Sequence, residues 1–532
     1  MLSVTLPPDT LRADKDAARH GYACEAVTRR DGLRELCARL KDQGYFLECL
    51  TALDFSDAFE LVYVFSRTES ASRFLTKVVL PKPDASGPGV GDIFPAARWY
   101  EREVYDFFGI RFDPHPNLKR LILPETPRIH PLLKSFKGSA VGADAEEVLS
   151  AIHEDRAAFD LLNPRTPKND ADSYELNLGP QHPATHGVMR IIARITGERV
   201  LSTECTIGYG HRNHEKMAEI QDYRAFWPNL GRLDYVGAMA YNFTYAELIE
   251  RAMGIEAPAR AQTIRVLLTE LNRIASHLLW LATFLLDLGA FTPYFYCFDD
   301  REKILDITEL CTGERLTYNF FRFGGVAHDI PEKRIQNMIS DFIPAFRQKL
   351  KDYRTLIGKN IIFRKRTQGI GVLSKETALA YGVTGPSLRA SGVCRDDRRV
   401  TPYSIYPRLD FEIPVRSEGD SYARYLVRMD EMAQSLRIVE QIYRNLPPGE
   451  ILLPKVPKTV PRGEYYFSTE SARGSFGIYL ASDGSPTPYR LKLRTPSFSN
   501  ISAFSELGRE CFIADLISIF GSFDAIVSEI DR

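Results

Sequence analysis

Two histidines stand four residues apart in the stretch LGPQHPATHGVMR, residues 178–190. Its glycines and prolines disfavour regular structure, so we expect a constrained loop to carry His182 and His186. Imidazole is a common ligand for zinc and other transition metals, and half of a metal site is therefore one hypothesis. The loop contains no Cys or carboxylate to complete such a site. A hydrogen-bonded structural turn is the alternative.

Three further segments carry ionisable side chains, and each has an ordinary structural explanation. GYGHRNHEK, residues 208–216, is expected to open a helix, and a solvated helix N-terminus would have the same composition. In RLDYV, residues 232–236, Tyr235 would ordinarily be a packing residue. His277 lies one turn after Arg273 in a stretch of helical apolar periodicity and would ordinarily be a buried core histidine. Taken singly, these segments identify no reaction.

The composition is that of an ordinary soluble protein and excludes several classes of function. The chain has 532 residues, 44% hydrophobic and 26% charged, which predicts a large core divided among two or three domains. Its formal charge of -1 at pH 7 gives no long-range field for nucleic acid or an anionic membrane surface, so any partner must be recognised locally. The eight cysteines are spread singly without a CxxC pair. This chain alone is therefore not expected to hold an iron-sulfur cluster or a structural zinc, and a reducing compartment suits it.

Motif spacing and hydropathy exclude further classes. GPGVG at residues 87–91 and GIG at 369–371 fit neither GxGxxG nor a lysine-bearing phosphate loop, so the chain is not expected to bind NAD, FAD or ATP. No GxSxG or HExxH motif supports a hydrolase or a zinc protease. The N-terminus lacks the pattern of a secretory signal, and the most apolar stretch, residues 278–286, is far shorter than the roughly 20 residues that span a bilayer. We expect a chain that is soluble, or peripheral to a membrane through partners.

The hydrophobic pattern divides the chain into three parts. Residues 1–137 predict a compact α+β domain, in which the aromatic segment 99–110 is buried or faces another protein. Residues 138–173 are predicted to be a linker with one short helix, and residues 174–532 a mainly helical domain with small β-sheets. The predicted helices include 31–43, 145–161, 261–288, 422–446 and 503–520, and the predicted strands are 59–66, 77–80, 175–178, 188–195, 200–207, 463–468, 477–481 and 490–494.

The order of the motifs carries more information than any one of them. GPQHPATHG, GYGHRNHEK, RLDYV, ELNRIASHLL, LLDLGAFTP, DDREKILD, RFGGVAHDIP, RTQGIGVLS and SYARYLVRMDEMAQSLR occur in this order. Similar segments occur in the same order in the quinone-reducing catalytic subunit of respiratory complex I. The upstream segment WYEREVYDFFGIRFDPHPNLKRLILP is similar to the smaller peripheral-arm subunit that accompanies it. The chain thus resembles, over nearly its whole length, the fused C/D subunit of bacterial NADH:quinone oxidoreductase.

The resemblance implies a fold and excludes one activity. It implies an N-terminal small α/β domain, of the smaller peripheral-arm subunit type, fused to a mainly helical domain that is similar to the large subunit of nickel-iron hydrogenases. Those enzymes hold their metal with two CxxC pairs, which would fall here near HRNHEKMAE, residues 211–219, and within residues 524–532. Both places lack cysteine. The soft thiolate site that nickel needs is absent, so hydrogenase activity is excluded, and in complex I the equivalent space is part of a quinone cavity.

The resemblance also assigns roles to single residues. His186 and Tyr235 match the pair that hydrogen-bonds the quinone headgroup, and their chemistry suits a reduction that takes up two protons. Asp287 matches the carboxylate that orients the histidine, whereas His182 is expected to shape the loop. Arg212, Arg232 and His277 match residues beside a 4Fe-4S cluster that the family holds on a neighbouring small subunit. The segment departs from the usual family pattern at Gly210, Asn213 and His214, which bears on the cluster environment.

The implied function is that of a peripheral-arm subunit of a proton-translocating NADH:quinone oxidoreductase, with quinone as substrate and no metal or flavin bound by this chain. The implied partners are the cluster-bearing small subunit, the ferredoxin-like subunit and the membrane subunit at the quinone entrance. The expected location is the cytoplasmic side of the bacterial inner membrane, as a peripheral membrane protein. The same role in a ferredoxin- or other donor-driven relative that lacks the NADH module is one alternative, and a scaffold subunit is another.

Overall fold

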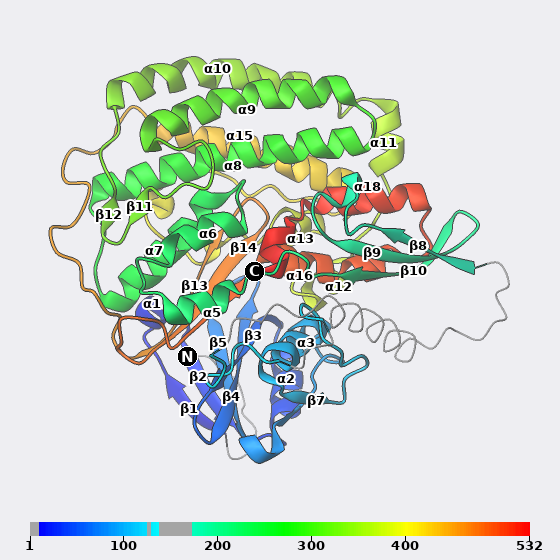
Figure 1. The fold of residues 1–532 in the computed structure, drawn as a ribbon. Helices are drawn as coiled ribbons and strands as arrows, with labels where there is room; N and C mark the ends of the chain where they lie inside the picture. Colours follow the sequence, from blue (N-terminus) through cyan, green and yellow to red (C-terminus); the bar gives the residue numbers. More distant parts are fainter. Residues whose placement is uncertain (1–9, 125–128, 138–172) are drawn as a thin grey trace.

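The computed structural model describes residues 10–124, 129–137 and 173–532. The helix expected at 145–161 lies outside the described residues, as does the expected linker up to residue 172. The first part contains a five-stranded sheet with the order β1-β2-β5-β4-β3, in which β2 and β5 are parallel and the other neighbours antiparallel (Figure 1). Its strands are β1 (Leu11–Asp14), β2 (Cys24–Thr28), β3 (Tyr45–Asp54), β4 (Ala58–Arg67) and β5 (Arg73–Pro81).

Both faces of this sheet are covered, which explains why β3 is buried at every position. Side chains that alternate along the strands point to opposite faces. On one face they pack against α2 (Leu33–Asp42) and α3 (Ala97–Phe108). On the other face, Leu53 and Val62 pack against Tyr466 and Tyr479 of the second part of the chain. The sheet is therefore the middle layer between its own helices and the rest of the molecule.

The aromatic segment expected to be buried or to face another protein forms α3 and is buried within the chain. The Tyr100 hydroxyl donates a hydrogen bond to the Glu48 carbonyl oxygen at 3.1 Å, and the Tyr100 ring lies 5.2 Å from the ring of Phe498. Gly109 ends the helix in a left-handed conformation with φ of 77°. Its aromatic side chains thus join the first part of the chain to the second.

Asp106, in the last turn of α3, organises the loop that follows. One carboxylate oxygen accepts hydrogen bonds from three consecutive backbone N–H groups of residues 121–123, and the other accepts one from Arg120 at 2.9 Å. This loop passes against Gly208 of the second part. A Cβ atom at Gly208, whose φ is 106°, would lie only 1.9 Å from the carbonyl oxygen of Ile122. Only glycine fits such a close approach of two backbones.

The second part begins with an antiparallel meander of β8 (Ser173–Leu178), β9 (Arg190–Thr196) and β10 (Arg199–Thr206), as the strand pattern predicted. A bundle of long helices follows, which Figure 1 shows at the top of the molecule. Its longest member was predicted at 261–288 and is α8, which packs against α9 and α15. The bundle helices are α7 (Ala238–Met253), α8 (Ala259–Asp287), α9 (Phe291–Thr312), α10 (Glu332–Leu356) and α15 (Ser421–Ile442).

A three-stranded antiparallel sheet connects the bundle to the first part of the chain. Its strands are β13 (Gly463–Glu470), β14 (Ser475–Ser482) and β15 (Arg490–Arg494). β13 packs against α7, and β15 contacts β3. The remaining elements are short and surround these layers. They include α1 (Ala17–His20), β6 (Ser86–Pro88), β7 (Arg111–Asp113), α5 (His214–Ile220), α6 (Trp227–Leu233), β11 (Phe321–Arg322), β12 (Gly325–Val326), α11 (Ile361–Thr367), α12 (Lys375–Ala380), α13 (Pro386–Ala390), α14 (Asp397–Val400), α16 (Pro496–Ser502) and α19 (Val527–Asp531).

The helix predicted at 503–520 was wrong, because two helices replace it. α17 (Phe504–Leu507) ends at Gly508, and α18 (Ile513–Phe523) begins five residues later. Between them the backbone pairs with β10, where Val200 N–H donates to the Cys511 carbonyl and Glu510 N–H donates to the Val200 carbonyl. Hydrogen bonding to the exposed edge of a sheet thus outweighed local helical periodicity.

Charged residues are buried where the two parts of the chain meet. Arg73 of β5 pairs with Glu48 of β3 at 3.0 Å and also contacts Ser468 of β13. A Cβ atom at Gly21, whose φ is 79°, would clash with the carbonyl oxygen of Tyr466 at 1.5 Å. This arrangement confirms the expected α+β fold class with small sheets beside a helical bundle. Among the described residues, no helix is long and apolar enough to cross a membrane.

We predict that Asp106→Ala lowers the free energy of unfolding by about 3–5 kcal/mol, because it leaves three backbone N–H groups and one guanidinium without their buried acceptor. Urea unfolding followed by circular dichroism measures the change. The control is Asp14→Ala, which removes an exposed pair with Arg12 and should cost under about 1 kcal/mol. Equal effects of the two substitutions would contradict this role of Asp106.

Candidate functional site

The loop between β8 and β9 is a tight turn whose two histidines do different things. Residues Pro183–Thr185 form a single 3-10 turn, and His182 Nδ1 accepts a hydrogen bond from the Ala184 N–H at 3.1 Å. The Thr185 hydroxyl lies 2.9 Å from the carbonyl oxygens on either side of it, those of His182 and Gly187. His182 therefore has the loop-shaping role expected for it. The turn ends at His186, which takes a left-handed conformation with φ of 50°.

This conformation turns His186 toward the end of α8. His186 Nε2 lies 2.8 Å from Asp287 Oδ2, and both side chains are largely but not fully buried. The pair joins residues that are 101 positions apart in the sequence. The imidazole also meets the ring of Phe520 edge to face at 6.4 Å. Two of the three expected catalytic residues are thus in direct contact.

The C-terminal end of α18 packs against Asp287 of this pair. A Cβ atom at Gly521 would lie 2.9 Å from Asp287 Oδ2 and 3.1 Å from Phe284, so the carboxylate occupies space that any larger residue would fill. Trp280 Nε1 donates to the Gly521 carbonyl oxygen at 2.8 Å, which fixes α18 against α8. The position of Asp287 therefore depends on a helix near the end of the chain.

Tyr235 lies in the turn between α6 and α7. Its neighbour Asp234 shapes this turn, because Asp234 Oδ1 accepts from the Gly237 N–H at 2.8 Å and Asp234 Oδ2 from Arg473 at 2.7 Å. Tyr235 is 38% exposed, so its side chain faces a solvent-accessible space. Burial of the rest of the residue raises the pKa of its hydroxyl, which therefore keeps its proton at neutral pH.

A second ion pair brings Tyr235 and His186 into one electrostatic environment. Arg473 bridges Asp234 to Asp524, whose Oδ1 lies 3.1 Å from the guanidinium. Burial raises the pKa of Asp524 to about 6, although Arg473 opposes this effect. Asp524 interacts electrostatically with both Tyr235 and His186. Arg473 and Asp524 thus connect the turn that carries Tyr235 to the end of α18, against which Asp287 rests.

Arg212 and Arg232 are exposed and lie around one buried histidine. The pKa of His214 is lowered to about 4, first by burial and then by the charge of Arg212, with Arg232 adding to the effect. Arg232 also donates to the Pro228 carbonyl oxygen within its own helix. These two arginines are the expected neighbours of a cluster, and the charges of both act on His214. His214 is one of the departures from the family pattern.

His277, the third residue expected beside a cluster, is fully buried in α8. Its Nε2 lies 3.0 Å from Glu431 Oε2, and Arg389 holds the other oxygen of Glu431. Burial lowers the pKa of His277 to about 4, and the nearby charges of Arg428 and Arg273 also lower it. The Nδ1 atom of His277 has no hydrogen-bond partner among the described residues.

The two segments that would carry the hydrogenase cysteines meet in the structure. The backbone N–H groups of Gly208 and Gly210 donate to the Asp531 carboxylate at 2.8 and 2.6 Å, and His211 Nδ1 lies 2.7 Å from the Asp531 carbonyl oxygen. A carboxylate held by backbone donors thus stands where a thiolate site would be. Among the described residues, no group of three or more His, Cys, Asp and Glu side chains could hold a metal ion.

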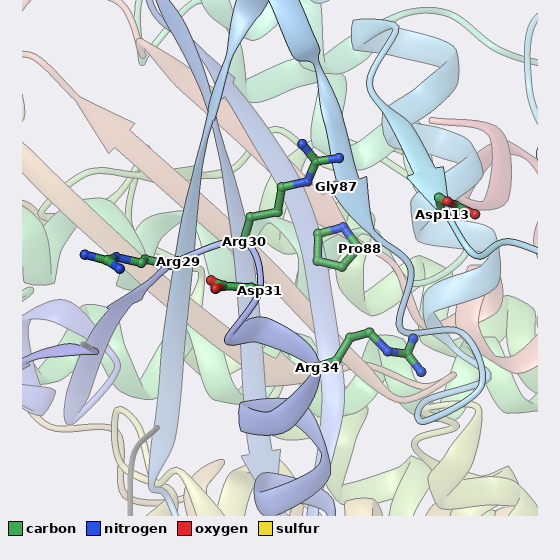
Figure 2. A pocket seen from close by; sticks show the side chains of 7 residues that line it. All are labelled: Arg29, Arg30, Asp31, Arg34, Gly87, Pro88 and Asp113. Atoms are coloured by element: carbon green, nitrogen blue, oxygen red, sulfur yellow. The ribbon is translucent and has the colours of Figure 1, made fainter. Parts of the chain in front are cut away.

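A separate cavity of about 520 Å³ lies in the first part of the chain, between the start of α2 and the strands β6 and β7 (Figure 2). It is rich in arginine, but Arg30 pairs with Asp84 at 2.6 Å and Arg34 pairs with Asp92 at 2.6 Å. These carboxylates compensate the positive charge. None of the expected site residues lines this cavity.

Comparisons with known proteins agree with the order of the motifs. A family model described as respiratory-chain NADH dehydrogenase, 49 Kd subunit, matches residues 287–459 and 455–532, and one described as the 30 Kd subunit matches residues 26–141. The C/D subunit of the NADH-quinone oxidoreductase of Methylococcus capsulatus is 38% identical over 508 residues, which cover 90% of this chain and 86% of the relative. A C/D subunit of the same enzyme from Aquifex aeolicus is 37% identical over 554 residues, with 94% of each chain covered.

The chain belongs to the family of fused C/D subunits of complex I. The unfused D subunit of Syntrophobacter fumaroxidans, which is 51% identical over 361 residues, covers 68% of the chain, and 96% of that relative is matched. The resemblance inferred from motif order is thereby confirmed, and the C/D chain is a subunit of an NADH-quinone oxidoreductase. Its fold also agrees with the expected fusion of a small α/β unit to a mainly helical one.

Sequence reasoning missed the residues that connect the site of this C/D chain. Arg473, Asp524 and Glu431 were not among the expected site residues, although Asp524 lies in the segment where cysteines were sought. No spacing signal was available, because Arg473 bridges Asp234 and Asp524 across 239 and 51 positions. Of the three, only Glu431 lies in a motif that the sequence analysis used, SYARYLVRMDEMAQSLR.

We predict that the C/D chain loses stability between pH 7 and pH 5 in part because of His277. The pKa of His277 is about 4 in the folded chain and about 6.5 in an unfolded one. Between these pH values the imidazole is protonated in the unfolded state and neutral in the folded state. This contribution therefore destabilises the fold as the pH falls from about 6.5 toward 4. It amounts to about 2 kcal/mol at pH 5.

The measurement compares urea unfolding at pH 7 and pH 5 for the unsubstituted chain and for His277→Met. The variant should lose about 2 kcal/mol less between the two pH values. His328→Met, which removes an exposed histidine, serves as the control and should behave like the unsubstituted chain. If His277→Met shows the same pH dependence as this control, His277 is not held neutral.

Proposed function

We propose that this subunit forms the quinone-reduction site of its complex, with His186 and Tyr235 as the proton donors and Asp287 as the partner of His186. The observation that carries the proposal is the 2.8 Å contact between His186 and Asp287, together with the partial exposure of Tyr235, whose turn Arg473 connects to the end of α18 beneath Asp287. In this proposal the two donors face one quinone headgroup from different elements, His186 from the turn before β9 and Tyr235 from the turn between α6 and α7. A quinone headgroup needs such an arrangement, because its two carbonyl oxygens lie on opposite sides of the ring.

The proposed chemistry reduces a quinone to a quinol, which takes up two electrons and two protons. One proton comes from the Tyr235 hydroxyl, which the raised pKa keeps protonated until the quinone oxygen gains negative charge. The other proton comes from His186, whose ring Asp287 orients through the contact at Nε2. Each donor is then reprotonated from solvent. The side chains of this chain thus hold and supply the protons, and the electrons arrive from outside the chain.

The proposed electron donor to the quinone is a 4Fe-4S cluster on a partner subunit. Two observations support a position near Arg212 and Arg232: both are exposed, and their combined field already lowers the pKa of His214. Positive charge at this position would stabilise a reduced, more negative cluster. The side chain of His277 is fully buried, so it would act on the cluster only through the electrostatic field of its imidazole, from inside the helical bundle.

The rest of the proposal concerns the surroundings of the subunit. Its proposed partners are the cluster-bearing small subunit, the ferredoxin-like subunit and a membrane subunit at the quinone entrance, and its proposed location is the cytoplasmic side of the inner membrane. The names of the relatives favour NADH as the donor of the complex over ferredoxin. We retain the division into residues 1–137, 138–173 and 174–532 within this proposal. A pure scaffold is disfavoured, because it would not need the His186–Asp287 contact.

We predict that Tyr235→Phe, in the assembled complex, slows the reduction of a short-chain quinone by about a hundredfold or more, because one proton donor is lost. Assembly should be normal, since the Tyr235 hydroxyl has no hydrogen-bond partner among the described residues whose loss would disturb the fold. Steady-state turnover and blue-native electrophoresis measure the two properties. The matched control is Tyr174→Phe at an exposed tyrosine of β8, which should leave turnover unchanged. Normal turnover in Tyr235→Phe would refute the assignment.

We also predict that His277→Met keeps activity in the complex but makes the midpoint potential of the neighbouring cluster less dependent on pH. Negative charge near His277 would raise its pKa from about 4 toward the neutral range, so that proton uptake by the imidazole accompanies reduction. Redox titration by electron paramagnetic resonance at pH 6 and pH 8 measures the slope. His328→Met is the control, and a slope in His277→Met equal to that in the control would remove His277 from this role.

A further inference from the structure

One short stretch of the chain carries a charge far out of proportion to the whole. Residues 349–366, KLKDYRTLIGKNIIFRKR, contain seven basic residues and one acidic residue, whereas the complete chain has a net charge of -1. The stretch comprises the last turns of α10 and almost all of α11. We call it the basic end of the bundle. The near-neutral total therefore hides a strong local positive field.

Large apolar side chains are exposed within the same stretch. Ile361 and Ile362, in the first turn of α11, are 68% and 67% exposed, and Leu356 at the end of α10 is 48% exposed. The opposite side of α11 is anchored, because Phe363 is buried and packs against Phe284 at 5.9 Å. α11 is thus a helix with a fixed inner face and an apolar outer face.

The apolar surface continues onto the neighbouring helix end. Phe291 and Phe295 stand one turn apart on the first part of α9 and are both more than 60% exposed. The end of α10 is tied to this region, because the Tyr353 hydroxyl donates to Asp300 at 2.6 Å. Figure 1 shows α11 beside the ends of α8, α9 and α10. These residues therefore belong to one end of the bundle.

Much of the positive charge at the basic end has no acidic partner. Arg354 pairs with Asp430, and Lys349 lies over the ring of Tyr296 at 5.7 Å. By contrast, Lys359, Arg364 and Lys365 are exposed, and no carboxylate pairs with them among the described residues. The nearby acids are occupied otherwise: Asp299 pairs with Lys303, and Asp352 accepts from Gln348.

From these observations we infer that the basic end of the bundle docks on an anionic lipid bilayer, with Ile361, Ile362 and Leu356 in the headgroup region and the lysines and arginines against the lipid phosphates. An exposed apolar helix face flanked by unpaired basic side chains is the pattern of an interfacial helix. Each basic side chain near an anionic surface contributes about 1 kcal/mol, so Lys359, Arg364 and Lys365 together change an association constant by more than a hundredfold.

The position of this surface relative to the quinone site supports lipid as the occupant, and this step rests on the proposed function. The patch borders the site, since Leu286, which precedes Asp287, is exposed at the same end of α8, and Phe284 of that helix holds Phe363 of α11. A quinone with an apolar tail is dissolved in the bilayer. The chain that reduces it must bring its site to the membrane surface, and the basic end would orient the site there.

The test is flotation of the purified full-length chain with vesicles. Vesicles of phosphatidylcholine with 30–40% phosphatidylglycerol, or about one anionic lipid in three, should bind the chain at low salt and release it at high salt, and pure phosphatidylcholine should bind it at least tenfold more weakly. The double substitution Arg364→Glu with Lys365→Glu, and separately Ile361→Ser with Ile362→Ser, should each reduce binding at least tenfold. Ile220→Ser, at an equally exposed isoleucine of α5 (70% exposed), should leave binding unchanged.

Three outcomes would overturn the inference: no binding to either vesicle, equal binding to both, or equal loss in the Ile220→Ser control. If the charge-reversed chain still binds vesicles normally but fails to join the complex, the basic end contacts an acidic protein surface instead of lipid. Circular dichroism checks that the variants fold. Because the assay contains no quinone, its result is independent of Tyr235→Phe, and failure of one proposal does not decide the other.

Discussion

The site depends on one buried guanidinium. Arg473, in the turn between β13 and β14, binds Asp234 and Asp524 at once, and neither contact is open to solvent. Removing it would leave two buried carboxylates without compensation, which is far more costly than losing an exposed pair. Through Asp234 the arginine holds the turn that carries Tyr235. Through Asp524 it holds the end of α18, on which Asp287 and therefore His186 rest.

The same principle extends through the interior, where charged groups connect elements that hydrophobic packing alone would leave free to slide. Glu431 of α15 binds His277 on one side and Arg389 of α13 on the other, so a histidine in α8 is coupled to two helices that lie 100 or more residues away in the sequence. Buried pairs of this kind stabilise little in total because of the cost of desolvation. Their contribution is to fix one arrangement of the helices and strands. Side chains that must act together need a fixed geometry more than a large free energy of unfolding.

Local patterns were sufficient to predict several of the regular elements. The apolar periodicity of 261–288 predicted α8, and the strand-like stretches at 188–195 and 200–207 predicted β9 and β10. Local patterns failed at 503–520, because the unpaired edge of β10 captures the backbone there and breaks the helix. The contact of His186 with Asp287 was expected only from the family resemblance. Asp524 was missed altogether, since its role arises from a pairing that no local pattern encodes.

Two glycines show how closely the two parts of the chain are matched. Gly21 lies in the first part, where the backbone of Tyr466 passes against it, and Gly208 lies in the second, where the backbone of Ile122 does the same. Each glycine is required by a neighbour that the other part supplies. A larger residue at Gly21 or Gly208 would therefore clash with the backbone of the other half. Seen from one half alone, each glycine would be assigned to a local turn, whereas the limit on its size comes from the backbone of the other half.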